Sequence, residues 1–168
     1  GRGTLKAALR RKNITDEQMI AAGLLIQPED EGREAYDRFR DRVIFPITDK
    51  RDRVIAFGGR TMVAGDENKL AKYLNSPETA LFHKGHVLYN LAQASSASRD
   101  EGTVIVTEGY MDVIVLSQAG FENVVAPLGT ALTEEQISEL WKVVREPVMC
   151  FDGDNAGVRA QGRAAERA

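Results

Sequence analysis

Residues 103–113, T-V-I-V-T-E-G-Y-M-D-V, decide the fold, because a short β-branched run passes directly into a helical pattern through acidic residues. The run 103–107 has the composition of a strand buried on both faces. Further strand-like runs follow at 123–126 and 147–151, and a helical pattern comes after each of the three runs. This alternation predicts an α/β fold with a parallel sheet and right-handed crossovers.

Acidic residues follow the first and third of these runs. Glu108 comes directly after the first run, Asp112 lies one helical turn later, and Asp152 and Asp154 follow the third run in D-G-D, where Gly153 permits a tight turn. Functional groups gather at the carboxyl ends of parallel strands. If the first and third strands are neighbours, four carboxylates converge, and this crowding favours Mg²⁺ or Mn²⁺. Taken one at a time, Glu108 and Asp152 are as well explained as helix caps and Asp154 as a loop residue.

The upstream part reads as a mixed α+β region. A capping box from Thr15 to Gln18 opens a helix, and Gly23 lies near its end. The apolar runs 43–47 and 54–57 flank a polar turn, which predicts a hairpin with Pro46 at an edge or a bulge. We therefore divide the chain into residues 1–100, an α+β subdomain, and residues 101–168, a parallel-sheet subdomain.

Basic residues of the upstream part form a candidate phosphate-binding set. Gly58-Gly59 predicts a sharp bend that brings Arg60 close to a phosphate, which arginine can grip with two hydrogen bonds. Arg38, Arg40 and Arg42 alternate, so on a strand they would share one face open to a nucleic-acid backbone. A lone arginine or lysine is more often a solvated surface residue.

Composition restricts the class of protein. The hydrophobic fraction is 43% and the charged fraction 28%, as in soluble globular proteins, and no apolar run reaches the ~20 residues of a membrane span. Cys150 is the single cysteine, which excludes an internal disulfide; we expect it to be buried in a strand and Trp141 to lie in the core.

The first 100 residues carry 17 basic and 14 acidic side chains, and residues 101–168 carry 5 and 11. A basic part beside an acidic part suits phosphates beside metal-binding carboxylates.

Several motifs together resemble a known family. T-E-G-Y-M-D-V at 107–113 and F-D-G-D-N-A-G at 151–157 resemble the two acidic motifs of the TOPRIM fold, and P-L-G-T at 127–130 narrows the likeness to bacterial DNA primases of the DnaG type. Four upstream stretches resemble the primase's amino-terminal polymerase subdomain: R-F-R-D-R-V-I-F-P-I at 38–47, V-I-A-F-G-G-R at 54–60, K-Y-L-N-S-P-E-T at 72–79 and F-H-K-G at 82–85. The resemblance covers nearly the whole chain.

The resemblance implies roles for particular residues. Glu108, Asp152 and Asp154 match metal ligands, and Asp112 matches the second acid of the first motif. Arg60, Lys72 and Lys84 match basic positions near nucleotide and template. Asn75 and Tyr73 are candidate polar or stacking contacts beside them, and Arg38, Arg40 and Arg42 remain candidates from their alternation alone. The implied activity is metal-dependent RNA primer synthesis from NTPs on a single-stranded DNA template, in the cytoplasm of a bacterium, with two or more Mg²⁺ or Mn²⁺ ions.

The family also has parts that do not match this stretch. One is a zinc-binding domain, which holds the family's only zinc site. The others are a carboxyl-terminal domain that contacts the replicative helicase and a later strand with further aspartates. We therefore expect a partial catalytic core that binds metal weakly by itself.

Two other classes of function remain open from the sequence. One is a different TOPRIM enzyme that cuts DNA, a topoisomerase or a nuclease. A topoisomerase needs a nucleophilic tyrosine elsewhere, whereas Tyr110 beside the acids matches a primase motif position. The other is a non-catalytic fragment that binds nucleotide or DNA.

Overall fold

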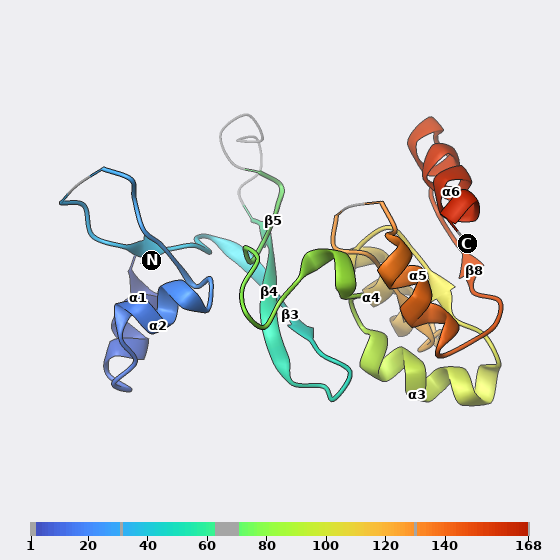
Figure 1. Cartoon of the computed structure of the whole chain (residues 1–168), viewed down its shortest axis with the longest axis horizontal. Coiled ribbons are helices and arrows are strands. Elements are labelled where there is room, and N and C mark those ends of the chain that lie inside the picture. Colours follow the sequence, from blue (N-terminus) through green and yellow to red (C-terminus); the bar gives the residue numbers. More distant parts are fainter. Residues whose placement is uncertain (1–2, 31, 63–70, 130, 168) are drawn as a thin grey trace. The chain divides into compact units, whose positions relative to one another are not determined.

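The computed structural model describes residues 3–30, 32–62, 71–129 and 131–167 (Figure 1). The chain forms two compact units, one made of Gly1–Pro46 with Ile55–Phe82 and the other of Ile47–Val54 with His83–Ala168. The second unit thus begins well before residue 100, where the sequence analysis divided the chain. No helix of the described residues is long and apolar enough to cross a bilayer.

The first unit opens with two short helices and a two-stranded sheet. They are α1 (Thr4–Arg10), α2 (Asp16–Ala21), β1 (Leu25–Ile26) and β2 (Tyr36–Asp37), with β1 and β2 antiparallel. The predicted capping box is confirmed, since the Thr15 hydroxyl accepts the N–H of Gln18 and the Gln18 amide oxygen accepts the N–H of Thr15. At the start of α1, which has no side-chain cap of its own, the buried Asp37 carboxylate accepts the N–H groups of Leu5 and Lys6.

A second, antiparallel sheet contains the predicted hairpin. Its strands are β3 (Arg42–Thr48), β4 (Val54–Thr61) and β5 (Tyr73–Asn75), in the order β3-β4-β5. Pro46 lies in β3, which has one neighbouring strand among the described residues, so its predicted edge position is confirmed. Proline is tolerated there because an edge strand has N–H groups without a ladder partner.

The second unit alternates strands and helices as predicted. Its elements are the 3₁₀ turn η1 (Lys84–His86), α3 (Leu91–Glu101), β6 (Ile105–Val106), α4 (Tyr110–Gln118), β7 (Val124–Val125), α5 (Glu134–Trp141), β8 (Val148–Met149) and α6 (Asn155–Arg167). The three strands form a parallel sheet in the order β7-β6-β8. The first and third strands of the alternation are therefore neighbours, the arrangement on which the prediction of converging acids depended.

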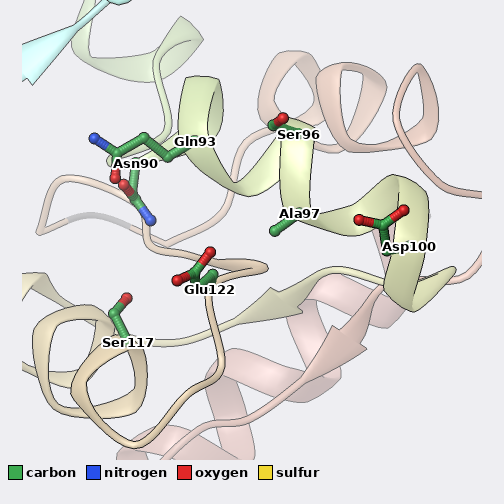
Figure 2. A pocket seen from close by; sticks show the side chains of 7 residues that line it. All are labelled: Asn90, Gln93, Ser96, Ala97, Asp100, Ser117 and Glu122. Carbon is green, nitrogen blue, oxygen red and sulfur yellow. The ribbon is translucent and has the colours of Figure 1, made fainter.

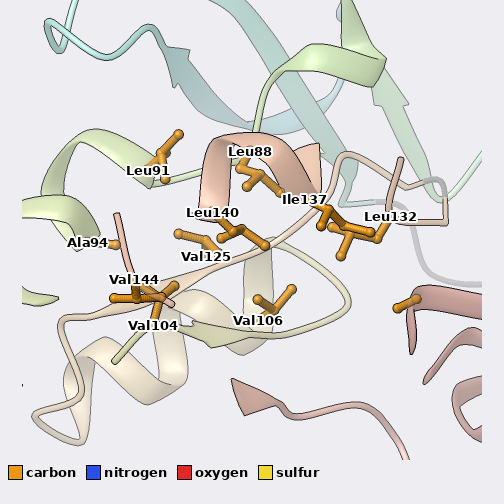
Figure 3. Packing of buried hydrophobic residues seen from close by; sticks show 11 residues of the cluster. Leu88, Leu91, Ala94, Val104, Val106, Val125, Leu132, Ile137, Leu140 and Val144 are labelled. Atoms are coloured by element: carbon orange, nitrogen blue, oxygen red, sulfur yellow. The ribbon is translucent and has the colours of Figure 1, made fainter. Parts of the chain in front are cut away.

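One apolar cluster holds this unit together (Figure 3). It combines Val106 of β6 and Val104, which shortly precedes this strand, with the α5 residues Ile137 and Leu140, all of them buried. Fully burying side chains of this size stabilises a fold by about 1.5–3 kcal/mol each. A second capping box, from Thr133 to Gln136, fixes the start of α5 and so positions this apolar face.

Two predictions about single residues in this unit were wrong. Trp141 is 47% exposed. It is the last residue of α5 and lies at the edge of the buried apolar face formed by Ile137, Leu140 and Val144. Cys150 is exposed rather than buried. It follows β8, which pairs only with β6 among the described strands, so no described strand covers its other side.

Candidate active site

The Glu108 side chain links the segments that follow the neighbouring strands β6 and β8 through a hydrogen bond. Thr107, directly after β6, is buried, and its hydroxyl donates to the backbone carbonyl of Val125 at 3.1 Å. Glu108 is the next residue, and its Oε1 accepts the backbone N–H of Asp152 at 2.9 Å. The Glu108 carboxylate therefore lies beside the backbone that follows β8, at the carboxyl edge of the sheet.

Gly157 brings the start of α6 against this carboxylate. A Cβ atom at position 157 would lie 2.0 Å from the Asp152 carbonyl oxygen and 2.9 Å from Glu108 Oε1, both too close for any side chain. Gly153, by contrast, has nothing within 4 Å of such an atom and does not have a positive φ. The interpretation that Gly153 permits the turn was wrong; the glycine that the geometry requires is Gly157.

Asp112 and Asp154 each serve a helix start. Asp112 Oδ2 accepts the N–H of Gly109 at 2.9 Å in the first turn of α4, and Asp154 Oδ1 accepts the N–H of Gly157 at 2.8 Å in the first turn of α6. A carboxylate in the first helical turn stabilises the helix through otherwise unpaired N–H groups and the helix dipole. The structure thus gives the capping role to Asp112 and Asp154, whereas the alternative weighed from the sequence gave it to Glu108 and Asp152.

The structure brings Glu108 together with the Asp152 backbone, but it does not gather a closed ligand set. Within the described ranges, no three His, Cys, Asp or Glu side chains form a group that could hold a metal ion. The chemistry of the donors nevertheless fits Mg²⁺ or Mn²⁺, since Glu108, Asp152 and Asp154 offer only carboxylate oxygens and none of the three is buried. The assignment of these three acids as metal ligands stays a prediction.

A pocket of about 310 Å³ adjoins Glu108. The other residues that line it come from the 127–132 segment, from the end of β8 and from α6: Pro127, Gly129, Ala131, Leu132, Phe151, Ala160 and Arg163. Arg163 was not among the predicted site residues. Only its position in the Ala- and Arg-rich last helix, two turns after the second acidic motif, could have indicated it.

A second pocket of the same unit, of about 470 Å³, lies apart from the acids (Figure 2). It is lined by α3, the end of α4 and the turn before β7, and its polar side chains include Asn90, Gln93, Asp100 and Glu122. None of the four predicted acids lines it, so it does not belong to the candidate active site.

The first unit collects several of the predicted nucleotide-binding residues on one strand pair. Arg60 on β4 lies directly opposite Tyr73 on β5, with its guanidinium carbon 6.0 Å from the ring centroid. Asn75 lies two residues after Tyr73 and therefore on the same face of the sheet, and Lys72 directly precedes β5. A half-buried cation beside an exposed aromatic ring suits phosphate and base contacts.

Gly58 and Gly59 do not form the predicted bend. Both lie within β4, and neither has a positive φ. A Cβ atom at Gly59 would lie 2.9 Å from the Phe39 ring and 3.0 Å from Arg42 Cδ. Gly59 is thus required for close packing of these side chains on the strand that carries Arg60.

The predicted shared face of three arginines is also wrong. Residues 38–41 lie between β2 and β3 rather than on a strand. Arg38 donates two hydrogen bonds, of 3.0 and 2.9 Å, to the Asn75 carbonyl, and Arg42 donates to the carbonyls of Gly59 and Lys72. Burial lowers the pKa of both Arg38 and Arg42 from the ordinary value. Arg40 instead lies over the Tyr36 ring, at 4.9 Å from its centroid.

Lys84 belongs to the second unit, where the start of α5 fixes its backbone. The Gln136 side chain, fully buried, donates to the Lys84 carbonyl at 3.2 Å, and the Thr133 hydroxyl donates to the Gly85 carbonyl at 2.6 Å. His83 and His86 are exposed, as expected for surface histidines.

Tyr110 lacks the surroundings of a nucleophile. Its side chain is 5% exposed and packs edge-to-face on Tyr89, with ring centroids 4.7 Å apart. Burial raises the pKa of the Tyr110 hydroxyl far above its ordinary value. A phenol that is buried and hard to ionise is poorly suited to attack DNA, which agrees with the interpretation of Tyr110 as a motif residue rather than a nucleophile.

Comparison with known proteins agrees with this geometry. Residues 102–168 match the Toprim domain family, so the parallel-sheet unit is of the Toprim class. Residues 1–95 match the family described as the DNA primase catalytic core, N-terminal domain. With both matches in chain order, the chain belongs to the DNA primase family.

Individual relatives show the same assignment. The DNA primase of Pseudomonas aeruginosa is 54% identical over 154 residues, which are 92% of this chain and 22% of the relative, and that of Escherichia coli K12 is 48% identical over 152 residues, 90% of this chain and 25% of the relative. A solved structure of a DnaG primase catalytic domain bound to ssDNA superposes with a TM-score of 0.84 at 43% identity, covering 100% of this chain and 50% of that one. The chain thus spans about a quarter of the length of these curated relatives.

Proposed function

We propose that this chain forms part of the catalytic core of an enzyme that synthesises RNA primers from NTPs on a single-stranded DNA template in the bacterial cytoplasm. The observation that carries the proposal is the Glu108 carboxylate held against the Asp152 backbone at the carboxyl ends of two neighbouring parallel strands. Family membership and the DNA-bound relative support the same substrate class. The family resemblance implies one further partner of the whole enzyme, the replicative helicase.

The acids and the cations have separate tasks in this proposal. Glu108, Asp152 and Asp154 hold Mg²⁺ or Mn²⁺, and Asp112 keeps the start of α4 in place beside Glu108. Such ions supply activation of the attacking 3′-hydroxyl and neutralise charge on the leaving pyrophosphate. All donors in this set are hard oxygens, which these cations prefer.

The nucleotide and template contacts are assigned to residues that are exposed, Lys72 and Tyr73, or half-buried, Arg60, Asn75 and Lys84. Arg60 binds phosphate, Tyr73 stacks on a base, and Asn75, Lys72 and Lys84 add polar and cationic contacts. Because Arg38 and Arg42 donate to backbone carbonyls, we assign them to positioning strands β4 and β5. Arg40, which is stacked on Tyr36 at the surface of the first unit, remains a candidate contact to the DNA backbone.

Metal binding is tested by titrating this chain with Mn²⁺ and following paramagnetic broadening residue by residue. We expect broadening to centre on Glu108, Asp152 and Asp154 and to disappear in Glu108→Gln. Broadening centred on Asp100 and Glu122, the acids of the other pocket, would contradict the assignment.

Activity is tested by exchange with a relative. The 154 matching residues of the Pseudomonas aeruginosa primase are replaced by this chain, and primer synthesis on single-stranded DNA is measured. We expect the chimaera to synthesise primers and its Glu108→Gln variant to be inactive. A chimaera that is folded, binds DNA and makes no primers would instead support the non-catalytic alternative.

A further inference from the structure

The pocket beside Glu108 has two chemically different parts. Pro127 and Leu132, both buried, and Phe151 give it apolar walls. Glu108 and Arg163 bring a carboxylate and a guanidinium to the same pocket. With a volume of about 310 Å³, the pocket lies at the lower end of the ~300–1,000 Å³ range of small-molecule sites.

Arg163 differs from the other arginines whose contacts are described. Arg10, Arg33 and Arg53 pair with carboxylates, and Arg38 and Arg42 donate to backbone carbonyls. Across the described part of the chain, no carboxylate lies within ion-pair distance of Arg163 and no acceptor takes its hydrogen bonds. Its five N–H donors are therefore available to a ligand in the pocket that it lines.

The backbone of α6 holds Arg163 in this position. Gly157 lets the first turn of the helix approach Glu108, Ala160 lines the pocket one turn later, and Ala164 is 1% exposed within the apolar cluster. Three small residues on one side of α6 thus fix the helix against the carboxyl edge of the sheet. Arg163 extends from the same two turns, so its approach to the pocket is set by packing rather than by a flexible loop.

We propose that this pocket binds a single nucleotide, with Arg163 donating hydrogen bonds to its phosphate and the apolar walls contacting its ribose or base. The inference rests on the proposed function and names a further binding residue for it. A guanidinium recognises phosphate through paired, charge-assisted hydrogen bonds, and apolar walls suit the flat faces of a nucleoside. The pocket's volume suits one nucleotide better than a strand.

The charges give this role a distinctive signature. Arg163 and Glu108 line one pocket, so the positive charge of Arg163 opposes binding of a divalent cation at Glu108 while it favours binding of a phosphate. Arg163→Gln is therefore expected to weaken nucleotide binding and to leave Mn²⁺ binding unchanged or slightly stronger. A substitution that merely damaged the fold of α6 would weaken both.

The experiment measures three binding constants for this chain and its variants. GTP binding is measured in EDTA by calorimetry, Mn²⁺ binding without nucleotide, and binding of a short single-stranded DNA oligonucleotide separately. Arg159→Gln is the matched control, because Arg159 is exposed on the same helix, does not line the pocket and changes the net charge equally. We expect Arg163→Gln to weaken GTP binding about tenfold, Arg163→Lys to restore part of it, and Arg159→Gln to change it less than about twofold.

Each other outcome overturns the inference in a recognisable way. An equal effect of Arg159→Gln would mean that net charge alone is responsible. Loss of DNA binding with unchanged GTP binding would assign Arg163 to the strand instead of a mononucleotide. Unchanged GTP binding in Arg163→Gln, with Mn²⁺ binding still abolished by Glu108→Gln, would refute the nucleotide pocket and leave the proposed function standing. Failure of the unmodified chain to bind Mn²⁺, GTP or DNA would count against both.

Discussion

Gly157→Ala tests whether the close approach of α6 to Glu108 holds the candidate active site together. The added methyl group would lie 2.0 Å from the Asp152 carbonyl oxygen, whereas ordinary contact begins at 3.4 Å. The obstacle is backbone, so no side-chain rotation relieves it, and either α6 or the 152–154 segment must move. That movement would disturb the hydrogen bond from Asp152 N–H to Glu108 Oε1.

The size of the effect follows from two opposing contributions. Overpacking a tight contact costs about 1–3 kcal/mol, while replacing glycine by alanine within a helix gains about 1 kcal/mol. We expect a net loss of up to about 2 kcal/mol, which lowers the Tm by up to about 8 °C in a chain of this length. Mn²⁺ affinity should fall in the same variant, because the displaced backbone carries Asp152 and Asp154.

Gly162→Ala is the matched control for this experiment. Gly162 lies in the same helix, but a Cβ atom there has nothing within 4 Å. Only the gain in helix propensity remains, so Gly162→Ala should raise stability by about 0.5–1 kcal/mol. Thermal unfolding followed by circular dichroism, with Mn²⁺ titration alongside, measures both variants. Equal shifts of the same sign, or an unchanged Mn²⁺ affinity in Gly157→Ala, would refute the argument that α6 packs against the acids.

Three further predictions concern charged residues. Asp154→Asn should lower Mn²⁺ affinity and leave Tm nearly unchanged, since its amide oxygen can still accept the helix-start N–H, whereas Asp154→Ala should also cost about 1 kcal/mol, measured by urea unfolding. Arg60→Gln should weaken GTP or DNA binding severalfold with a Tm change below about 2 °C, because Arg60 is only half-buried and its described side-chain contact is the Tyr73 ring; a large drop in Tm would make Arg60 structural. Hydrogen bonds from Arg10 lower the pKa of Asp16, so Asp16 contributes stability at neutral pH that is lost as the pH falls through this lowered pKa; Asp16→Asn should remove that component from an acid-unfolding curve, and an identical curve would exclude it.

Local patterns in the sequence predicted the local structure well. The predicted capping box at Thr15 involves residues three apart, so its geometry is encoded in a single turn. The strand–helix alternation predicted a parallel sheet and placed Glu108 and Asp152 after strands that end at the same edge. It did not predict the order of the strands; that the first and third are neighbours was a condition, which the structure meets.

Contacts between distant residues could not be read from these patterns. Arg38 donates to Asn75, 37 residues away, and nothing in the alternation of Arg38, Arg40 and Arg42 distinguishes such an arginine from one that faces solvent. Likewise, D-G-D-N-A-G contains two glycines, and only the fold reveals that Gly157 meets the Glu108 carboxylate. Exposure of Cys150 depends on which strand lies beside β8, which is again a tertiary property.

The candidate acids also have a structural task that does not require a metal. Glu108, Asp112 and Asp154 each accept a backbone N–H, at Asp152, Gly109 and Gly157 respectively. Two of these N–H groups belong to helix starts, where a missing acceptor costs stability whether or not a cation is bound. Loss of activity in an alanine variant at these positions therefore cannot separate catalysis from folding. Asn and Gln variants can, because they keep an acceptor oxygen and remove only the charge that a divalent cation needs.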